Sequence, residues 1–323
     1  MIFEKIEIER IINDKNISQK KHFRYKLDSL MREYQQLFHK TLFVNESLIM
    51  KNKKIIIPLT KNIKTEEYSF YGDPIEIFSE GLISFENYEN TRNQIKKLNG
   101  KKLFKFQVKD EKEIINNESP LIESVISEIY IDLSQSLEAI KSYFSSNLRN
   151  EINKNYDGTT YEIVDKSNYR PNEIFDMMKF HIKISGRQTR SDDSWRQNEK
   201  MLLKDQGFLT RINYENKIIS YSFFCHDKFT CNYLSSVGER DYYKSIRNMH
   251  HKSLWMAIKQ AKKNRCKYFF VGPNTLYSKK GITEKEKSIE RFKSKFKGTN
   301  SKFVILNDLP DYDFYKKFIM QIK

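Results

Sequence analysis

Cysteine is scarce in this chain, and the few thiols present form no recognisable site. The three cysteines among 323 residues, Cys225, Cys231 and Cys266, offer neither a disulfide framework nor a paired Cys-x-x-Cys metal spacing. Cys225, His226 and Cys231 are close in sequence, but thiols on a strand are more often core residues than metal ligands. We therefore expect a reducing compartment and no metal site.

The sequence also lacks segments that direct a chain to or across a membrane. No apolar run is long enough to span a bilayer. The first residues, "MIFEKIEIERIINDK", are charged throughout, where a signal peptide has an apolar core. These absences favour a cytoplasmic location.

Several catalytic motifs are missing as well. The chain contains no Rossmann glycine pattern, no Walker loop, and no Ser or Cys nucleophile elbow. The sequence therefore favours chemistry that proceeds without a covalent enzyme intermediate.

Basic residues, in contrast, are abundant and unevenly distributed. Lys and Arg number 25 against 23 Asp and Glu in residues 1–155, but 33 against 19 in residues 156–323, and the net charge of the whole chain is +16. An anionic partner is therefore expected to bind the second half. The alternative is codon bias in an AT-rich genome, although such bias should affect both halves alike.

The length and the pattern of elements predict two domains, residues 1–155 and 156–323. Aromatic residues make up 14% of the chain and exclude a disordered protein. In the first half, runs rich in β-branched and aromatic residues predict strands, and apolar residues at helical spacing predict one bridging helix. The strands are expected at 53–60, 67–78, 101–108 and 127–134, and the helix at 136–155.

The second half predicts a longer alternation of helices and strands. A short strand at 161–167 is followed by helices at 172–185 and 194–205, the second capped by Ser191 or an aspartate beside it. A three-stranded antiparallel meander follows, and then helix, strand, helix and strand. These last elements are expected at 207–214, 217–225, 229–237, 245–265, 267–272, 284–298 and 302–306.

This order resembles the fold of the GNAT N-acetyltransferases. The segments "DSWRQNEKMLLKDQGFLTRINYENKIISYSFF", "SLWMAIKQAKKNRCKYFFVGPNT" and "TEKEKSIERFKSKF" further resemble the FemAB-like family of tandem GNAT-fold acyltransferases. The resemblance covers residues 120–300, and it is carried in the first half by "YGDPI", "YIDLS" and "SSNLRNEI". It implies an α/β (α+β) fold of two GNAT-like domains in tandem, with mixed, mostly antiparallel sheets flanked by helices.

The resemblance also implies an activity. Known members include aminoacyltransferases that move an amino acid from charged tRNA onto an amine of a peptidoglycan precursor, and related N-acyltransferases act in surface-polysaccharide biosynthesis. The stretch "HIKISGRQTRSDDSW" looks more like the polysaccharide-associated branch than the cross-bridge enzymes. The expected protein is an N-acyltransferase whose acceptor is an amino group of a nucleotide- or lipid-linked sugar.

Lys293 is the first candidate site residue, because a lysine interrupts an apolar helical stripe. The stripe consists of Ile289, Phe292 and Phe296, which share a face with Lys293. Next to Phe292, the Lys293 amine is placed to stabilise negative charge that develops on an acyl carbonyl, and the family resemblance implies this role. The alternative is that Lys293 covers the core with its stem and leaves its ammonium in water. Lys295 is expected to face solvent.

The loop at residues 186–191 is the second candidate site. Arg187 and Arg190 precede a helix N-terminus, where free backbone N–H groups already favour anions. We interpret the loop as a clamp for the diphosphate of the acceptor, with Trp195 and Gln197 flanking a base or sugar. The alternatives are a solvated basic loop for the arginines and core packing for Trp195.

His181 and three residues of the first half complete the predicted site. His181 has a suitable pKa to accept a proton from the attacking amine, although a half-buried structural histidine explains it as well. The resemblance places Arg149, Asp132 and Tyr71 near an acceptor cleft between the two halves. Ordinary explanations are a helix-surface charge for Arg149, a strand-end turn for Asp132, and a tight turn before a proline for Tyr71.

The acyl donor is either aminoacyl-tRNA or acyl-CoA. Ordinary GNAT enzymes bind the CoA pyrophosphate in a glycine-containing loop before the helix that follows the meander. At that place this chain reads "ERDYYKSIRNMHHKSLW", a segment without glycine. This departure and the basic second half favour tRNA. We expect no tightly bound cofactor. A peptidoglycan cross-bridge aminoacyltransferase remains an alternative, as does, more distantly, a non-catalytic nucleic-acid-binding protein without a recognisable RNA-binding motif.

Overall fold

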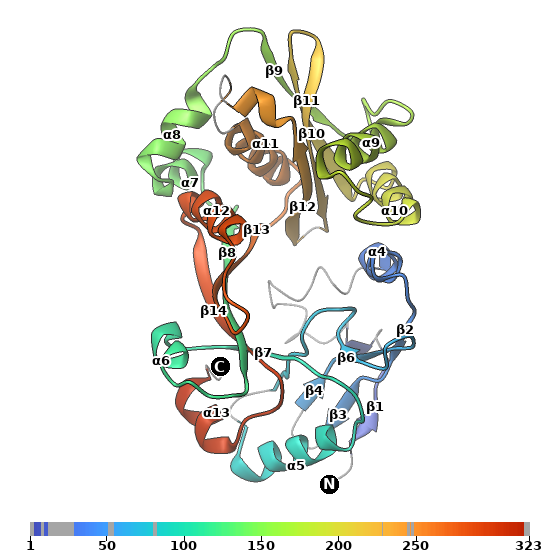
Figure 1. The fold of residues 1–323 in the computed structure, drawn as a ribbon, viewed down its shortest axis with the longest axis vertical. Helices are drawn as coiled ribbons and strands as arrows, with labels where there is room; N and C mark the ends of the chain where they lie inside the picture. Colours follow the sequence, from blue (N-terminus) through green and yellow to red (C-terminus); the bar gives the residue numbers. More distant parts are fainter. Residues whose placement is uncertain are drawn as a thin grey trace.

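The computed structural model describes residues 3–7, 10–11, 29–50, 55–79, 83–227, 229–243, 246 and 249–319. Its largest element is a mixed sheet of eight strands flanked by helices (Figure 1). In order across the sheet these strands are β7 (Phe104–Gln107), β14 (Thr299–Leu306), β8 (Ile122–Asp132), β13 (Tyr268–Ser278), β12 (Thr230–Gly238), β11 (Lys217–His226), β10 (Gly207–Tyr214) and β9 (Thr159–Val164). Neighbouring strands pair antiparallel, except β12 and β13, which are parallel. The mixed, mostly antiparallel sheet expected from the sequence is confirmed.

Strands β10 and β11 are apolar on both faces, because helices cover both sides of the sheet. Phe208 lies opposite Phe224, and Leu209 lies opposite Phe223. Successive side chains point to opposite faces of a strand, so the two pairs enter different cores. This explains why "FFC" at residues 223–225 is a continuous apolar run rather than an alternating one.

The helices divide between these two cores. The core that contains Phe208 and Phe224 is closed by α7 (Leu137–Tyr143), α8 (Ser146–Asn153), α11 (Met249–Lys263) and the end of α12 (Glu284–Lys293). The core that contains Leu209 and Phe223 is closed by α9 (Glu173–Ser185), α10 (Asp192–Leu203) and α4 (Ser29–His39). Helix α4 comes from the N-terminal part of the chain and packs against α10 (Figure 1).

The rest of the N-terminal part forms two small antiparallel sheets and a third core. One sheet contains β1 (Glu4–Lys5), β3 (Leu48–Met50) and β4 (Ile55–Ile57), and the other contains β2 (Phe43–Asn45), β5 (Thr60–Asn62) and β6 (Tyr68–Ser69). The core also includes apolar residues from three helices and from the ends of β7, β8 and β14. These helices are α5 (Phe85–Lys96), α6 (Glu111–Ile115) and α13 (Tyr312–Phe318). No helix in the described part of the chain is long and apolar enough to cross a membrane.

The large sheet takes strands from both sides of residue 155. Strand β8, which precedes this residue, lies between β13 and β14, which both follow it. The division into domains at residues 1–155 and 156–323 stays a prediction, and the backbone hydrogen bonds of the sheet cross that boundary.

The prediction of a single helix at 136–155 is wrong, because this segment forms two helices, α7 and α8. Phe144 and Ser145 have extended backbone angles, with ψ of 152° and 150°. The Ser145 side chain accepts a hydrogen bond from the Leu148 N–H and caps the second helix. The Arg149 guanidinium donates to the carbonyls of Ser142 and Phe144, which satisfies the end of the first helix.

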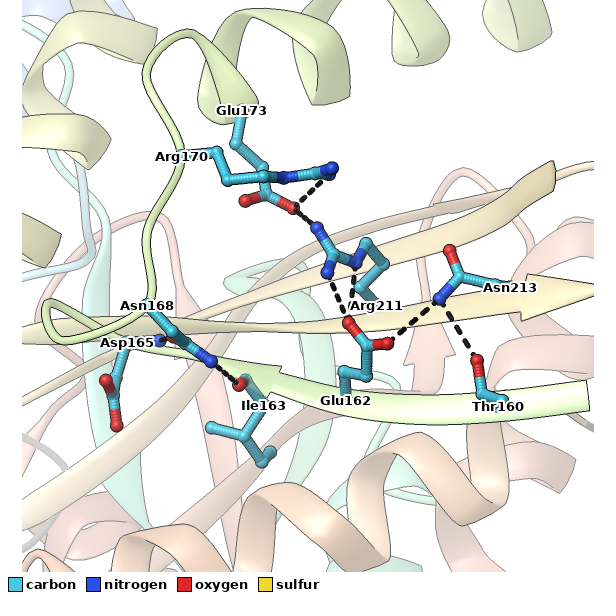
Figure 2. Close-up of polar contacts among 9 residues, drawn as sticks. All are labelled: Thr160, Glu162, Ile163, Asp165, Asn168, Arg170, Glu173, Arg211 and Asn213. Atoms are coloured by element: carbon cyan, nitrogen blue, oxygen red, sulfur yellow. Dashed lines mark hydrogen bonds and ion pairs between the residues drawn. The ribbon is translucent and has the colours of Figure 1, made fainter. Parts of the chain in front are cut away.

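An ion-pair network joins the edge of the large sheet to α9 (Figure 2). Arg211 on β10 pairs with Glu162 on β9 and with Glu173 at the start of α9, and Arg170 reaches Glu173 at 3.4 Å. Glu173 is only 1% exposed, so its carboxylate depends on the Arg211 guanidinium for compensation. The network fixes α9 against the sheet and so positions the C-terminal end of that helix, where the candidate site begins.

Candidate active site

A pocket opens where β12 and β13 separate. The two strands pair only over Thr230–Asn232 and Tyr268–Phe270 in the described part of the chain. Beyond these residues β12 continues beside β11, whereas β13 turns to β8. The pocket has a volume of about 1250 Å³ and is walled by β12 residues 233–238, the end of α9, the start of α11, and α12.

The pocket is strongly basic. Six of its described lining residues are Lys or Arg, and none of them is Asp or Glu. The six are Arg187, Arg240, Lys285, Arg291, Lys293 and Lys295. Hydroxyl groups from β12, α9 and α12 line the wall between these cations, among them those of Ser235, Ser185 and Ser288. Such a lining favours an anionic ligand.

Lys293 lies in this pocket, at the edge of β13. Its ammonium donates a hydrogen bond of 2.8 Å to the carbonyl oxygen of Pro273 and passes over Gly272. Gly272 has φ of +114°, a backbone conformation that favours glycine, and a Cβ atom there would lie 2.6 Å from the lysine Nζ and displace the amine. Burial lowers the pKa of Lys293 to about 8. The sequence predicted that this amine extends from the apolar face of the helix into a functional site, and the amine does lie in the pocket. Its catalytic role stays a prediction.

Phe292 fixes the helix that carries Lys293. Its ring stacks on the His251 ring with a centroid distance of 4.5 Å and an interplanar angle of 11°, and it packs against Phe296. His251 Nδ1 contacts a carboxylate oxygen of Glu151 on α8. Burial lowers the pKa of His251 to about 3, so the ring that contacts Glu151 is neutral.

Sequence reasoning missed His251 and Glu151. The available signal was the position of His251 on the apolar face of a helix, three residues before Leu254 and seven before Ile258. The partner Glu151 lies 100 positions away, and no local pattern connects the two residues.

Lys295 was expected to face solvent, but it lines the pocket. The α-helix ends at Lys293 and continues as a 3₁₀ turn, η4 (Ser294–Phe296), which rotates Lys295 onto the pocket wall. Its ammonium lies 3.8 Å from a Glu151 carboxylate oxygen. Lys287 is an exposed lysine of this helix that pairs with Glu284 and does not line the pocket.

His181 lies on the opposite side of the pocket, on α9. It is half-buried, with its ring against Trp195 and its Nδ1 3.5 Å from the Thr189 hydroxyl. Burial, together with the nearby Arg190, lowers the pKa of His181. A neutral imidazole in this position retains a nitrogen that is able to accept a proton.

The two arginines of the loop have different surroundings. Arg187 is exposed and lines the pocket. Arg190 is instead engaged by protein: it donates to the hydroxyls of Tyr34 and Ser235 at 2.9 and 3.2 Å, and it lies over the Trp195 ring. Arg187 therefore remains a candidate phosphate ligand, and Arg190 connects α4 to β12.

Trp195 and Gln197 are core residues of α10. Trp195 is 1% exposed, and the Gln197 amide donates to the Leu30 carbonyl and to Glu33 on α4. Ser191 caps α10 by accepting from the Ser194 N–H, as the sequence predicted. Neither Trp195 nor Gln197 lines the pocket, so the structure places them away from a base or sugar bound there.

The three residues of the first half also lie outside this pocket. Arg149 closes the break between α7 and α8, as described above. Asp132 accepts from the Ser134 N–H in the turn after β8. Tyr71 has φ of +50° in a tight turn and packs against Phe43 and Phe70. The acceptor-cleft roles of these residues stay predictions.

Two further sequence features are the segment after Glu239, which precedes α11, and the three cysteines. Glu239 forms ion pairs of 2.9 Å with Lys183 and Lys217, while residues 244, 245, 247 and 248 of the following segment lie outside the described residues. All three cysteines are buried. The described residues contain no group of three or more His, Cys, Asp or Glu side chains arranged to hold a metal ion.

Comparison with known proteins identifies the fold. No family model and no curated protein matches the sequence. The crystal structure of FemX matches with a TM-score of 0.55 and 11% identity, over 98% of this chain and 99% of that one. A GCN5-related N-acetyltransferase from Sphaerobacter thermophilus matches with a TM-score of 0.53 and 8% identity, over 94% of each chain. A conserved protein of unknown function from Bacteroides thetaiotaomicron matches with a TM-score of 0.50 and 10% identity, over 95% of this chain and 99% of that one. The chain has the GNAT fold that the sequence predicted.

Proposed function

We propose that the protein is an N-acyltransferase that moves an aminoacyl or acyl group onto an amino group of a nucleotide- or lipid-linked sugar in surface-polysaccharide or cell-envelope biosynthesis. The observation that carries this proposal is the half-buried amine of Lys293 in a basic pocket, at the point where β12 and β13 separate. The GNAT fold supports the reaction class, since the similar structures include a GCN5-related N-acetyltransferase.

The pocket supplies the groups that acyl transfer requires. The acceptor nitrogen attacks the carbonyl carbon of an ester or thioester, a C–N bond forms, and the C–O or C–S bond to the leaving group breaks. Negative charge develops on the carbonyl oxygen, where the Lys293 ammonium and backbone N–H groups of the separated β12 edge stabilise it. His181 or water accepts the proton released by the nitrogen.

The basic lining also acts on the acceptor. An ammonium group that enters a pocket with six cationic residues loses its proton more readily, because like charges disfavour its protonated form. The attacking amine is therefore neutral in the pocket. Phosphate groups of the donor or the acceptor offset the repulsion and hold the substrate in place, with Arg187 as one ligand.

The experiment tests donor and acceptor together. Purified protein is incubated with isotope-labelled aminoacyl-tRNA or acetyl-CoA, each in the presence of UDP-glucosamine, and the acceptor is analysed by mass spectrometry. UDP-N-acetylglucosamine is the matched control, since it differs by a blocked amine. We expect label on UDP-glucosamine alone, from one of the two donors.

The choice of donor distinguishes the two remaining chemistries. Transfer from acetyl-CoA would identify an acyl-CoA-dependent N-acetyltransferase, and transfer from charged tRNA an aminoacyltransferase. A wider panel adds lipid-linked amino sugars and a peptidoglycan precursor peptide. If no amine in the panel accepts a group from either donor, the proposed function is wrong.

A further inference from the structure

The amine of Lys293 is itself placed as a nucleophile. We infer that Lys293 is a self-acylation site: an acyl donor whose leaving group carries phosphate, such as an acyl phosphate, transfers its acyl group to Nζ in this pocket. This activity does not require that the protein transfer acyl groups to another molecule.

The geometry presents the nitrogen to a ligand. Nζ donates a hydrogen bond to the Pro273 carbonyl and lies over a residue without a side chain, Gly272. When the amine is neutral, one N–H still donates to Pro273 and the lone pair is free to attack. The pocket volume of about 1250 Å³ readily accommodates a small acyl phosphate.

The charges around Lys293 concentrate an anionic donor. Arg187 comes from the loop before α10, Arg240 from the turn after β12, Lys285 and Arg291 from α12 itself, and Lys295 from η4. The charge of Lys295 is partly offset, because its ammonium lies 3.8 Å from a carboxylate oxygen of Glu151. A phosphate group therefore gains favourable interactions as it enters the pocket, and it brings its acyl carbon to the lysine.

The other titratable groups near Lys293 do not change the positive charge of the pocket at pH 8. Burial lowers the pKa of His250 to about 4 and that of His251 to about 3, so both rings are neutral. Glu128 on β8 lies opposite Pro273, but its carboxylate is paired with Lys105 at 2.6 Å.

Lys293 is also a better nucleophile than an ordinary lysine near neutral pH. With a pKa lowered to about 8, it is about half neutral at pH 8. An amine with the reference lysine pKa of about 10.4 is roughly 0.4% neutral at that pH. The neutral fraction therefore rises by about two orders of magnitude, and only the neutral form attacks a carbonyl.

The reaction is balanced without a further reactant. Nζ attacks the acyl carbon, a C–N bond forms, the C–O bond to phosphate breaks with its electron pair, and the nitrogen releases one proton to the solvent. The product amide has no charge, so the pocket loses the cation nearest to β13. Acylation at Lys293 therefore inhibits any reaction that depends on its ammonium.

The test compares two lysines of one helix in the same protein. Wild-type protein is incubated with acetyl phosphate at pH 8, and peptide mass spectrometry gives the initial rates of acetylation at Lys293 and at the exposed Lys287. We expect Lys293 to react at least about tenfold faster, with a rate that rises with pH through a midpoint near 8. High salt should reduce this preference, because it screens the pocket cations.

A neutral reagent separates the effect of the lowered lysine pKa from the attraction of phosphate by the pocket cations. With p-nitrophenyl acetate, which has no phosphate, Lys293 should still react faster than Lys287, but replacing Arg291 by methionine should not alter its rate. The same substitution should slow the reaction with acetyl phosphate. Equal acetylation of Lys293 and Lys287 by acetyl phosphate would overturn the inference, whatever the neutral reagent does. Failure of transfer to UDP-glucosamine alone would affect only the proposed function.

Discussion

Lys293 is the residue at which chemistry and packing are most readily separated. Lys293→Met keeps the length and volume of the stem, so the packing of α12 should survive. If the ammonium stabilises the developing oxyanion, the variant should fold normally and lower kcat for acyl transfer by about 100-fold or more. Steady-state kinetics with the UDP-glucosamine assay, together with circular dichroism, would measure both properties.

Lys287→Met is the matched control for this substitution. Lys287 lies on the same helix, is exposed, and pairs with Glu284 rather than with the pocket. Its loss should leave both folding and turnover unchanged. A folded Lys293→Met protein with wild-type kcat would show that this lysine has no catalytic role.

The lowered pKa of Lys293 also predicts a dependence of stability on pH. The folded value of about 8 lies below the ordinary lysine value of about 10.4, so between these pH values the unfolded chain binds more protons. The contribution of Lys293 to the free energy of unfolding is therefore unfavourable at pH 7 and recovers as the pH rises from 8 to 10.

Urea unfolding of the wild type and of Lys293→Met at several pH values would measure this contribution. At pH 7 the variant should be more stable by about 2 kcal/mol, after allowance for the partial exposure of the lysine. The difference should shrink as the pH approaches 10. A difference that does not change with pH would mean that the ammonium is not desolvated.

Arg187 and Arg190 are adjacent to the same pocket but should respond differently to alanine substitution. Arg187 is exposed on the pocket wall, so its loss should raise KM for a phosphorylated acceptor about two- to fivefold and leave stability unchanged. Arg190 holds Tyr34 and Ser235, so Arg190→Ala should lower the melting temperature. Kinetics with phosphorylated and free sugars and thermal unfolding distinguish the two effects. If Arg187→Ala changed KM equally for both sugars, the residue would not bind phosphate.

At the scale of single elements, local patterns predicted most helices and strands but not where the chain changes direction. The periodicity of α9, α10 and β10 is strong, and their predicted positions agree with the structure within a few residues. The break at Phe144–Ser145 was missed because Leu137, Ile140 and Phe144 continue the helical spacing up to it. The 3₁₀ turn that rotates Lys295 was missed for the same reason: the apolar spacing continues to Phe296 across the change of helix type.

The candidate site was predicted only in part, because most of its contacts connect distant segments. The resemblance and the helical stripe identified Lys293, and the loop pattern identified Arg187. Nothing local indicated that Arg190 would be occupied by Tyr34, a residue 156 positions away. Pairings over such distances depend on the completed fold, which local propensity does not encode.

The network that anchors α9 gives a test at the same scale (Figure 2). Arg211→Met would leave the buried Glu173 with Arg170 alone, and the side chain of Arg170 is 58% exposed. An uncompensated buried carboxylate should lower the free energy of unfolding by about 3 kcal/mol. Arg170→Met should cost less than about 1 kcal/mol. In the double variant Arg211→Met/Glu173→Gln most of the loss should be recovered, as chemical denaturation would show. Equal costs for the two single arginine variants would rule out this account of the network.

At the scale of the whole molecule, the two halves are connected in several places, and two of these are strand β8 and helix α4. Strand β8 pairs with β13 on one side and with β14 on the other, and its residues Ile129 and Ile131 enter the core beneath α11. Far from this strand, α4 packs on α10 through Gln197 and through a 2.7 Å ion pair between Lys200 and Glu33. Both connections cross residue 155, so residues 156–323 do not contain all the strands of the sheet that surrounds the pocket.

This arrangement predicts how the chain unfolds and how it responds to truncation. Intact protein should unfold in one cooperative transition, with the same midpoint by tryptophan fluorescence and by far-ultraviolet circular dichroism. A fragment of residues 156–323 would leave the paired edges of β13 and β14 without β8, so it should aggregate or remain unfolded. A fragment that begins at residue 119 restores β8 and should be more soluble, although it still lacks α4 and β7. If residues 156–323 alone give a soluble fragment with a cooperative transition, the second half is an independent domain, and the strand taken from the first half is dispensable to its core.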